Sequence, residues 1–460
     1  MREQGNEGWA LALARQLCHV TWSNLPQQPR QAAMQKLVHA MGVSLAHGDL
    51  PASRTAWIAF GASRGESIGF GQRRRVATED AAFINGTIGH GSLLEDCGPG
   101  GLRGGSHPGT FIIPAALALA EEIDADGPAL LEAIVAGYET MHRLGAAAPA
   151  EIVQRRFRPL GIMGTLGAAA ASARLLDATP EQMAAALAIA ATLAGGTTQG
   201  IFEGTMDAYF EAAFAARNGI AAARLGLAGA STPVEALEGE FGFFQTYGGV
   251  QGNLEAITAR QDSYGIEHVG VKRFAACLQN QQTISLLVQG LASSLALSDV
   301  TKVIIKRSAT GTNGLNSPGV SRRDPFPNML AAQMAARFTA AAAILGHEVD
   351  NPDFFASHFD DPEITALTKR IELVPTTDSG VRIEITLRDG SELVLDGTNA
   401  DLLHPSLDEV IARFDARTSR VLGEPAAVEI RDAILSLADG RKVRDVTRCL
   451  ELSPVGERAV

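Results

Sequence analysis

The sequence predicts a mainly α-helical protein, in which a large all-helical domain is followed by a smaller α+β domain. The chain has 460 residues, which is too long for one simple hydrophobic core. Helix signals dominate as far as about residue 265, and aromatic residues make up only 5% of the chain while alanine is abundant. Strand patterns occur only after that point. We therefore expect an all-helical domain at residues 1–266, an α+β lid domain at 267–400, and C-terminal helices at 401–460 that return to the helical domain.

The helix predictions rest on apolar spacing and on capping signals. Residues 25–47 carry apolar side chains at helical spacing and end at Gly48. Gly127 and Pro128 open a second helix. Thr179, followed by proline and then by Gln182, forms a capping box with proline at the first helical position. These close-spaced alanine-rich segments favour tightly packed helices.

The strand predictions rest on β-branched and alternating residues. Residues 302–306 form a short β-branched run, KVIIK. Residues 381–396 alternate apolar and polar side chains around Asp389-Gly390, which predicts a two-stranded hairpin. Helical segments are expected at 282–297 and 329–345, and Ser406 opens a further helix.

Charge and cysteine usage exclude several classes of function. The formal net charge is −12, a field that repels nucleic acid and anionic membranes. An anionic substrate would have to be met by local arginine or lysine. The four cysteines are widely separated, and no zinc-ligand spacing occurs, so we expect reduced thiols and no metal. No signal peptide or membrane span is evident, which predicts a cytoplasmic protein.

Residues 85–114 form the most unusual segment, with six glycines between Gly98 and Gly109. Such glycine density argues against a helix or strand and favours a loop. The loop carries Asp96, Arg103 and His107, and loops on rigid scaffolds often carry functional sites. A flexible surface loop is the alternative interpretation. The segment lacks the Gly-Lys-Ser/Thr ending of a phosphate-binding loop.

Several strings in this order resemble the MmgE/PrpD family: AAFINGTIGHGSLLEDC with HPGTFIIPAALALAE, GIMGTLGAAAASARLLDAT, EALEGEFGFFQTY, and GVKRFAACLQNQQTISLL. The resemblance spans roughly residues 80–290. It implies a helical domain, an α+β lid, a site between them, and usually a homodimer. The family includes 2-methylcitrate dehydratase, cis-aconitate decarboxylase and an iminodisuccinate epimerase. It therefore implies proton transfer or carbanion formation beside a carboxylate, without a metal or organic cofactor.

The resemblance also implies roles for particular residues. Asp96 matches the acidic loop residue, His107 the histidine of a His-Pro pair, and Lys272 the junction lysine that reaches into the cleft. His107, tuned by Asp96, and Lys272 would move the proton. The alternatives are a helix-cap neighbour for His107, a loop cap for Asp96 and a solvated basic turn for Lys272.

The sequence departs from the family pattern at several positions. Arg158 stands where a histidine usually precedes proline; it cannot act as a base but can grip a carboxylate. A family lysine is missing near residues 207–211, and Cys277 lies in a stretch that usually holds a histidine. Arg103, Arg158 and Arg273 are predicted to bind substrate carboxylates. Cys277 could contact substrate or move a proton, although a buried structural thiol is the simpler interpretation.

We therefore expect a cofactor-free lyase, either a dehydratase or a decarboxylase, that acts on a small di- or tricarboxylate. An epimerase of an iminodisuccinate-like diacid is the first alternative. A non-catalytic dimeric binding protein is the second, because one lysine and one histidine of the family pattern are absent.

Overall fold

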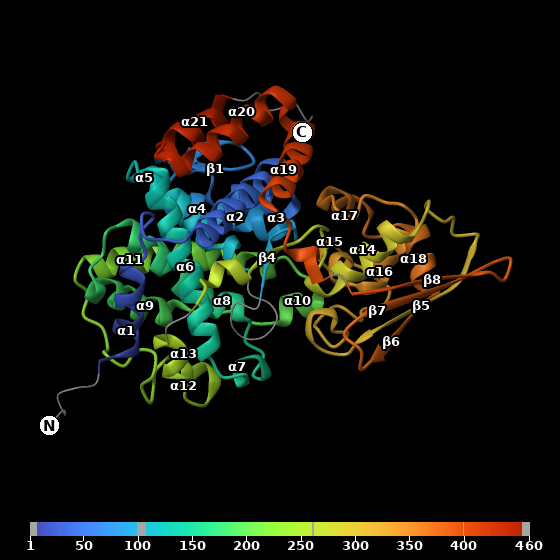
Figure 1. The fold of residues 1–460 in the computed structure, drawn as a ribbon, viewed down its shortest axis with the longest axis horizontal. Coiled ribbons are helices and arrows are strands. Elements are labelled where there is room, and N and C mark those ends of the chain that lie inside the picture. Colours follow the sequence, from blue (N-terminus) through green and yellow to red (C-terminus); the bar gives the residue numbers. More distant parts are fainter. Residues whose placement is uncertain (1–6, 99–106, 260–261, 399, 453–460) are drawn as a thin grey trace.

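The computed structural model describes residues 7–98, 107–259, 262–398 and 400–452. A large helical body forms one side of the molecule, and a smaller part containing a four-stranded sheet forms the other (Figure 1). The predicted fold class is confirmed. Among the described residues, no helix is long and apolar enough to cross a membrane.

The helical body also contains a short antiparallel pair, β1 (Ser67–Gly69) and β2 (Arg74–Val76), in a region where no strand was expected. Its other elements are mainly α-helices. They are α1 (Trp9–Cys18), α2 (Gln27–Ala46), α3 (Pro51–Phe60), α4 (Thr78–Gly91), α5 (Ile112–Glu122), α6 (Gly127–Ala147), α7 (Glu151–Gln154), α8 (Pro159–Leu175), α9 (Pro180–Leu193), α10 (Gln199–Glu203), α11 (Asp207–Leu227), α12 (Phe243–Gly248) and α13 (Leu254–Thr258). The capping box at Thr179 is present, with the side chain accepting from the backbone of Gln182.

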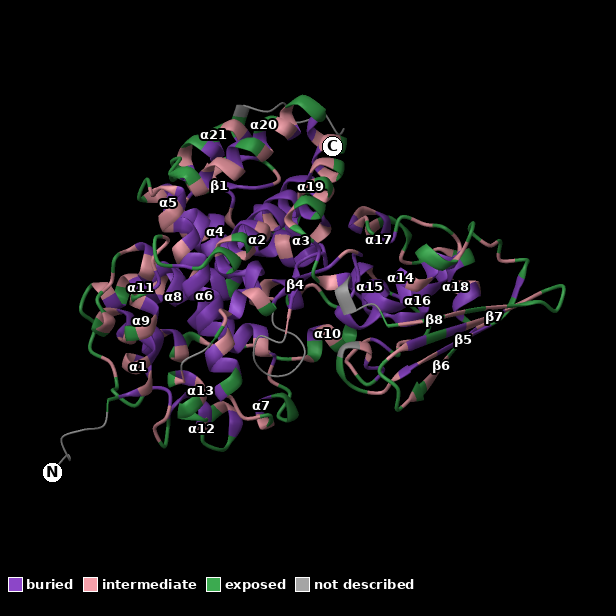
Figure 2. Ribbon diagram, viewed as in Figure 1, coloured by how far each residue is buried: buried purple, intermediate pink, exposed green. Residues whose placement is uncertain are grey.

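Helix α8 runs through the buried centre of this body and packs against α6, α9 and α11 (Figure 2). Small residues make this packing possible. A Cβ atom at Gly219 of α11 would lie 2.4 Å from the Cβ of Ala168, and one at Gly137 of α6 would lie 3.0 Å from the carbonyl oxygen of Gly167. The tight packing predicted from the alanine content is confirmed.

The sheet has the strand order β6-β5-β7-β8. Its strands are β5 (Val300–Ser308), β6 (Ile371–Thr376), β7 (Val381–Leu387) and β8 (Glu392–Gly397). The predicted hairpin is the antiparallel pair β7–β8, and Gly390 takes a φ of 85° in its turn. One face of the sheet packs against α14 (Gln281–Gly290) and α16 (Ala336–Ile344), while the other is more exposed (Figure 2).

Two predicted helices differ from the structure. The helix expected at 282–297 ends at Gly290, because Leu291 takes an extended backbone conformation. The helix expected at 329–345 is divided into α15 (Met329–Met334) and α16, with Ala335 extended between them. Polar groups outside the helix hold this break: the amide of Asn280 donates to the carbonyl of Met334, and the N–H of Ala336 donates to the carbonyl of Val320.

Three C-terminal helices follow the sheet: α19 (Leu407–Leu422), α20 (Glu424–Leu435) and α21 (Val443–Leu452). Helix α19 packs against α2, and α21 packs against α5. Two shorter helices, α17 (Pro352–His358) and α18 (Pro362–Thr368), belong to the smaller part. The domain boundaries proposed from the sequence stay a prediction.

Candidate functional site

A very short ladder brings the glycine-rich loop and the lysine junction together. Strand β3 (Asp96–Cys97) pairs with β4 (Gly270–Val271) in antiparallel register, with Asp96 opposite Val271. The residues that flank this ladder, Glu95 and Lys272, are therefore neighbours, although they lie 177 positions apart in the sequence.

Glu95 is the centre of the resulting polar cluster. Its Oε1 atom lies 2.6 Å from Nζ of Lys272, 3.3 Å from Nδ1 of His107 and 3.5 Å from Nδ1 of His90. Glu95, Lys272 and His90 are buried, and His107 is largely so. At this distance the buried ammonium of Lys272 and the buried carboxylate of Glu95 form an ion pair, in which each charge offsets the cost of removing the other from water.

Burial and neighbouring charges shift the titration of this cluster. Burial alone would raise the pKa of Glu95, but the Lys272 ammonium and the His107 imidazole bring it well below its ordinary value. Burial lowers the pKa of His107 to about 3, and the positive charge of Lys272 adds to this effect against the opposing pull of Glu95. His107 is therefore neutral at pH 7 in the free protein.

The hydrogen bonds of His107 indicate its tautomer. Its Nδ1 lies 2.8 Å from the main-chain carbonyl oxygen of Asp96, which can only accept. Nδ1 therefore carries the hydrogen, and Nε2 keeps a lone pair that can take a proton.

Arg158 connects to the same cluster from the N-terminus of α8. Its guanidinium donates to Nε2 of His90 at 2.7 Å and to Oε2 of Glu211 at 2.8 Å. Because arginine has no acceptor, His90 accepts at Nε2 and carries its hydrogen at Nδ1, on the side of Glu95. Burial lowers the pKa of His90, so this imidazole is also neutral.

A cavity of about 250 Å³ opens beside these groups. Its walls come both from the helical body and from segments after residue 270. The sequence-predicted residues that line it are His107, Arg158, Lys272 and Cys277, and two further polar residues in its wall are His90 and Glu95.

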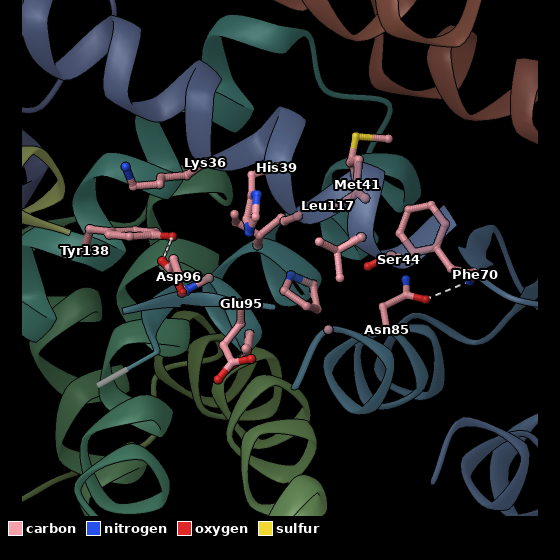
Figure 3. A pocket seen from close by; sticks show the side chains of 17 residues that line it. Lys36, His39, Met41, Ser44, Phe70, Asn85, Glu95, Asp96, Leu117 and Tyr138 are labelled. Carbon is pink, nitrogen blue, oxygen red and sulfur yellow. Dashed lines mark hydrogen bonds between the residues drawn. The ribbon is translucent and has the colours of Figure 1, made fainter. Parts of the chain in front are cut away.

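Asp96 points away from this cavity. Its carboxylate accepts from the hydroxyl of Tyr138 at 2.6 Å and from the N–H of Gly109 at 3.0 Å. Figure 3 shows the carboxylates of Glu95 and Asp96 projecting in different directions, with Asp96 beside Tyr138 and Lys36. Burial raises the pKa of Asp96 to about 6. Asp96 therefore holds the turn that carries His107, through its carboxylate and its carbonyl, and its carboxylate does not face the imidazole.

The remaining predicted residues lie in different places. Cys277 lines the cavity, but its thiol lies 3.5 Å from the carbonyl oxygen of Met334. Burial raises its pKa, so it stays a protonated thiol at neutral pH and is not available as a base. Arg273 lines a different pocket, described below. Arg103 lies outside the described residues. None of the described cysteines forms a disulfide.

Neither Glu95 nor His90 was among the site residues predicted from the sequence. The available signal was the acidic pair Glu95-Asp96 directly before the glycine-rich stretch, since successive residues of an extended segment face opposite sides. Among the described residues, no group of three or more histidine, cysteine or acidic side chains has an arrangement that could hold a metal ion.

Comparison with known proteins supports the resemblance. Residues 11–253, slightly more than half of the chain, match the MmgE/PrpD N-terminal domain. Cis-aconitate decarboxylase of Homo sapiens is 27% identical over 388 residues, which cover 79% of this chain and 78% of that protein. The cis-aconitate decarboxylase-like protein oryM of Aspergillus oryzae is 24% identical and covers 92% of this chain and 93% of its own. Cis-aconitate decarboxylase of Aspergillus terreus is 24% identical, with 84% and 82% covered.

Proposed function

This chain belongs to the MmgE/PrpD family, and we propose that it is a lyase that acts on a small di- or tricarboxylate, with decarboxylation of a cis-aconitate-like acid as the first candidate reaction. The observation that carries the proposal is the meeting of His107 and Lys272 on one oxygen of Glu95, in the wall of a cavity that Arg158 also lines. The names of the relatives support the choice of a carboxy-lyase.

Lys272 and Arg158 are the proposed carboxylate contacts. Each is paired with a carboxylate in the free protein, Lys272 with Glu95 and Arg158 with Glu211. Arginine can hold a carboxylate through two parallel hydrogen bonds, while lysine supplies a compact charge. The two cations thus meet an anion that the overall charge of −12 would otherwise repel.

His107 is the proposed proton carrier. A bound polyanion near its imidazole favours the protonated form, so substrate binding would raise its low pKa and draw a proton from solvent. In decarboxylation, the bond between the carboxylate carbon and its neighbour breaks and carbon dioxide leaves. The electron pair passes into the conjugated carboxylate system next to Lys272, and Nε2 of His107 delivers its proton to carbon.

A hydro-lyase is the second candidate, because Oε2 of Glu95 is buried and has no hydrogen-bond partner among the described residues. A substrate hydroxyl could donate to this oxygen. Neutral His107 could then remove the neighbouring C–H proton, while the ammonium of Lys272, which lies beside the same carboxylate, gives a proton to the departing oxygen so that it leaves as water. An unsatisfied buried acceptor of this kind is costly without such a donor.

The epimerase alternative has less support. An epimerase needs a proton donor and an acceptor on opposite faces of one carbon, whereas His107 and Lys272 both contact the same atom of Glu95. Cys277, whose pKa is raised by burial, is not suited to replace either. The non-catalytic alternative also has less support. A binding protein would need only the cations Arg158 and Lys272, whereas the neutral imidazole of His107 beside them is able to take up and release a proton.

We further propose that the reaction needs no metal or organic cofactor and that the protein is a cytoplasmic homodimer. Unchanged turnover after dialysis against a chelator, and a mass of twice 48.3 kDa in light scattering, are the expected results.

The central experiment follows candidate acids in deuterated water by proton NMR. Cis-aconitate is expected to lose carbon dioxide and give an alkene that carries one deuterium. Loss of water from a hydroxylated tricarboxylate would instead support the hydro-lyase. Deuterium exchange without net substrate loss would indicate an epimerase, and tight binding without any reaction would indicate the non-catalytic alternative.

A further inference from the structure

A second pocket, of about 350 Å³, lies between α19 and the segment that follows β4. Arg273 lines it from the junction, and Arg413 and Arg417 line it from α19. Because these two helical residues are one turn apart, they lie on the same face of α19. Three guanidinium groups from two separate parts of the chain therefore face one space.

These guanidinium groups repel one another. Burial lowers the pKa of Arg417 to about 10, and the charges of Arg413 and Arg273 add to that effect against the opposing charge of Asp350. Burial and the charge of Arg273 likewise lower the pKa of Arg413. Like charges held together in a partly buried space are costly unless an anion offsets them.

The described part of the chain leaves these arginines without close counter-ions. Within it, Arg273, Arg413 and Arg417 form no ion pair within 4.0 Å. Nη1 of Arg413 is buried without a hydrogen-bond partner there. The Arg417 guanidinium donates a long hydrogen bond, 3.5 Å, to the carbonyl oxygen of Arg273.

Acidic residues that share the pocket do not offset this charge fully. Glu409 uses its carboxylate to cap α19, where Oε2 accepts from the backbone N–H of Ser406 at 2.7 Å. This hydrogen bond lowers the pKa of Glu409, and the charges of Arg413 and Arg273 add to the effect, although neither arginine comes within ion-pair distance of it. Asp353 lies 3.7 Å from His47, and Asp350 is exposed at the rim. Arg420, at the outer end, has Glu348 at 3.6 Å.

We propose that this pocket, which we call the arginine pocket, is a second anion site that takes a phosphate-type dianion, separate from the catalytic cavity. Guanidinium groups bind phosphate oxygens through paired hydrogen bonds, and a tetrahedral dianion offers enough oxygens for three of them. The volume of the pocket accommodates a phosphate group with a small organic part.

The arginine pocket is coupled to catalysis by one peptide unit. Lys272 and Arg273 are consecutive, and their side chains enter different pockets: Lys272 lines the catalytic cavity and Arg273 the arginine pocket. A dianion that draws Arg273 toward α19 therefore acts on the backbone that positions Lys272. This coupling rests on the proposed function, whereas the binding itself does not.

The test is a calorimetric titration of the full chain with inorganic phosphate in a low-salt buffer. The wild-type protein is expected to bind one phosphate saturably, and Arg413→Gln and Arg417→Gln should each weaken binding at least about tenfold. Arg382→Gln, at a surface arginine paired with Glu384 and Asp396, is the matched control and should bind as wild type. Circular dichroism checks the fold of each variant.

The variant Lys272→Gln separates the two proposals, because it removes one of the two cations, Lys272 and Arg158, that line the catalytic cavity and should leave phosphate binding unchanged. Loss of binding in this variant would place the phosphate in the catalytic cavity and overturn the proposal. Absence of saturable binding in the wild type, or equal weakening by Arg382→Gln, would also overturn it. Citrate provides a further check. If Lys272→Gln bound citrate more tightly than phosphate, and if Arg413→Gln weakened citrate binding as well, the phosphate assignment would be refuted. Dissociation of a dimer by Arg413→Gln would show that a second copy of the chain fills the pocket.

Discussion

The Nζ atom of Lys272 lies 2.6 Å from Oε1 of Glu95, and both side chains are buried. The pair holds the lysine in the wall of the proposed catalytic cavity and gives it a fixed counter-charge. The imidazole of His107 lies beside this pair, with Nδ1 3.3 Å from the same oxygen of Glu95, so a change at any of the three side chains should affect the other two.

Replacement of the proposed proton carrier, His107, or of the lysine beside it, Lys272, should abolish most activity. We expect His107→Ala and Lys272→Ala to lower kcat at least about a hundredfold, within the roughly 10²–10⁴-fold range for acid–base groups. The exposed residues His268 and Lys369 provide matched controls, and their alanine variants should keep wild-type turnover. Wild-type kcat in both test variants would remove His107 and Lys272 from the mechanism.

The buried pair should show a stability pattern that differs from its activity pattern. Glu95→Gln leaves the ammonium of Lys272 without its carboxylate and should lower the free energy of unfolding by about 3–5 kcal/mol. The double variant Glu95→Gln with Lys272→Met should recover much of this loss, because no buried charge remains, yet stay inactive. Urea unfolding measures both. A cost below about 1 kcal/mol for Glu95→Gln would contradict a tightly coupled pair.

The imidazole of His107 should not titrate near neutral pH in the free protein. Its pKa is about 3 because of burial and the charge of Lys272. Between that value and the ordinary 6.5, the unfolded chain holds a proton that the folded chain does not, so His107 lowers stability as pH falls through this window. NMR of labelled histidine, assigned with His107→Gln, should show no change from pH 5 to 8 for this ring. A midpoint near 6.5 would contradict the burial argument.

Asp96 should have the opposite effect on stability. Burial raises its pKa from 3.8 to about 6, so the folded protein keeps a proton that the unfolded chain releases. Its favourable contribution is complete below pH 4 and is lost as the pH rises through 6. The Asp96→Asn side chain does not titrate and therefore does not lose this contribution. The free energy of unfolding of the variant, compared with that of the wild type, should rise by about 2–3 kcal/mol between pH 4 and 7. Urea unfolding at several pH values tests this, with the exposed Asp408→Asn as the control.

Arg158 should act on substrate binding more than on the chemical step. Arg158→Lys keeps the charge but loses the planar group that reaches both His90 and Glu211. We expect KM to rise about tenfold with a smaller change in kcat, since a contact made equally in the ground and transition states affects KM. The exposed neighbour Arg155→Lys should leave both constants unchanged. A fall in kcat at constant KM would assign Arg158 a role in the transition state.

The sequence predicted the elements more accurately than the direction of individual side chains. The capping box at Thr179 and the hairpin at 381–396 were predictable because each depends on local chemistry. The break at Ala335 was not, because it depends on a hydrogen bond that Asn280 donates to Met334 and on one that Val320 accepts from Ala336, and neither partner lies in the same helical segment.

At the candidate site, too, the sequence predicted the residues better than the directions of their side chains. His107, Arg158 and Lys272 were predicted and line one cavity. Two adjacent pairs were divided between different surroundings: Glu95 faces the imidazole while Asp96 faces Tyr138, and Lys272 enters the catalytic cavity while Arg273 enters the arginine pocket. In an extended segment a shift of one residue reverses the side on which a side chain lies, and no local signal fixes that choice.

The ladder between β3 and β4 also sets the time at which the site can exist. During synthesis at roughly 5–20 residues per second, the ribosome adds Lys272 about 10–35 seconds after Glu95. In that interval, the nascent chain holds the carboxylate of Glu95 without the ammonium that compensates its charge. A polypeptide released before residue 272 would therefore have to bury the carboxylate of Glu95 without its positively charged partner. Such a truncated chain would be degraded by quality control and would not act as a partly active enzyme.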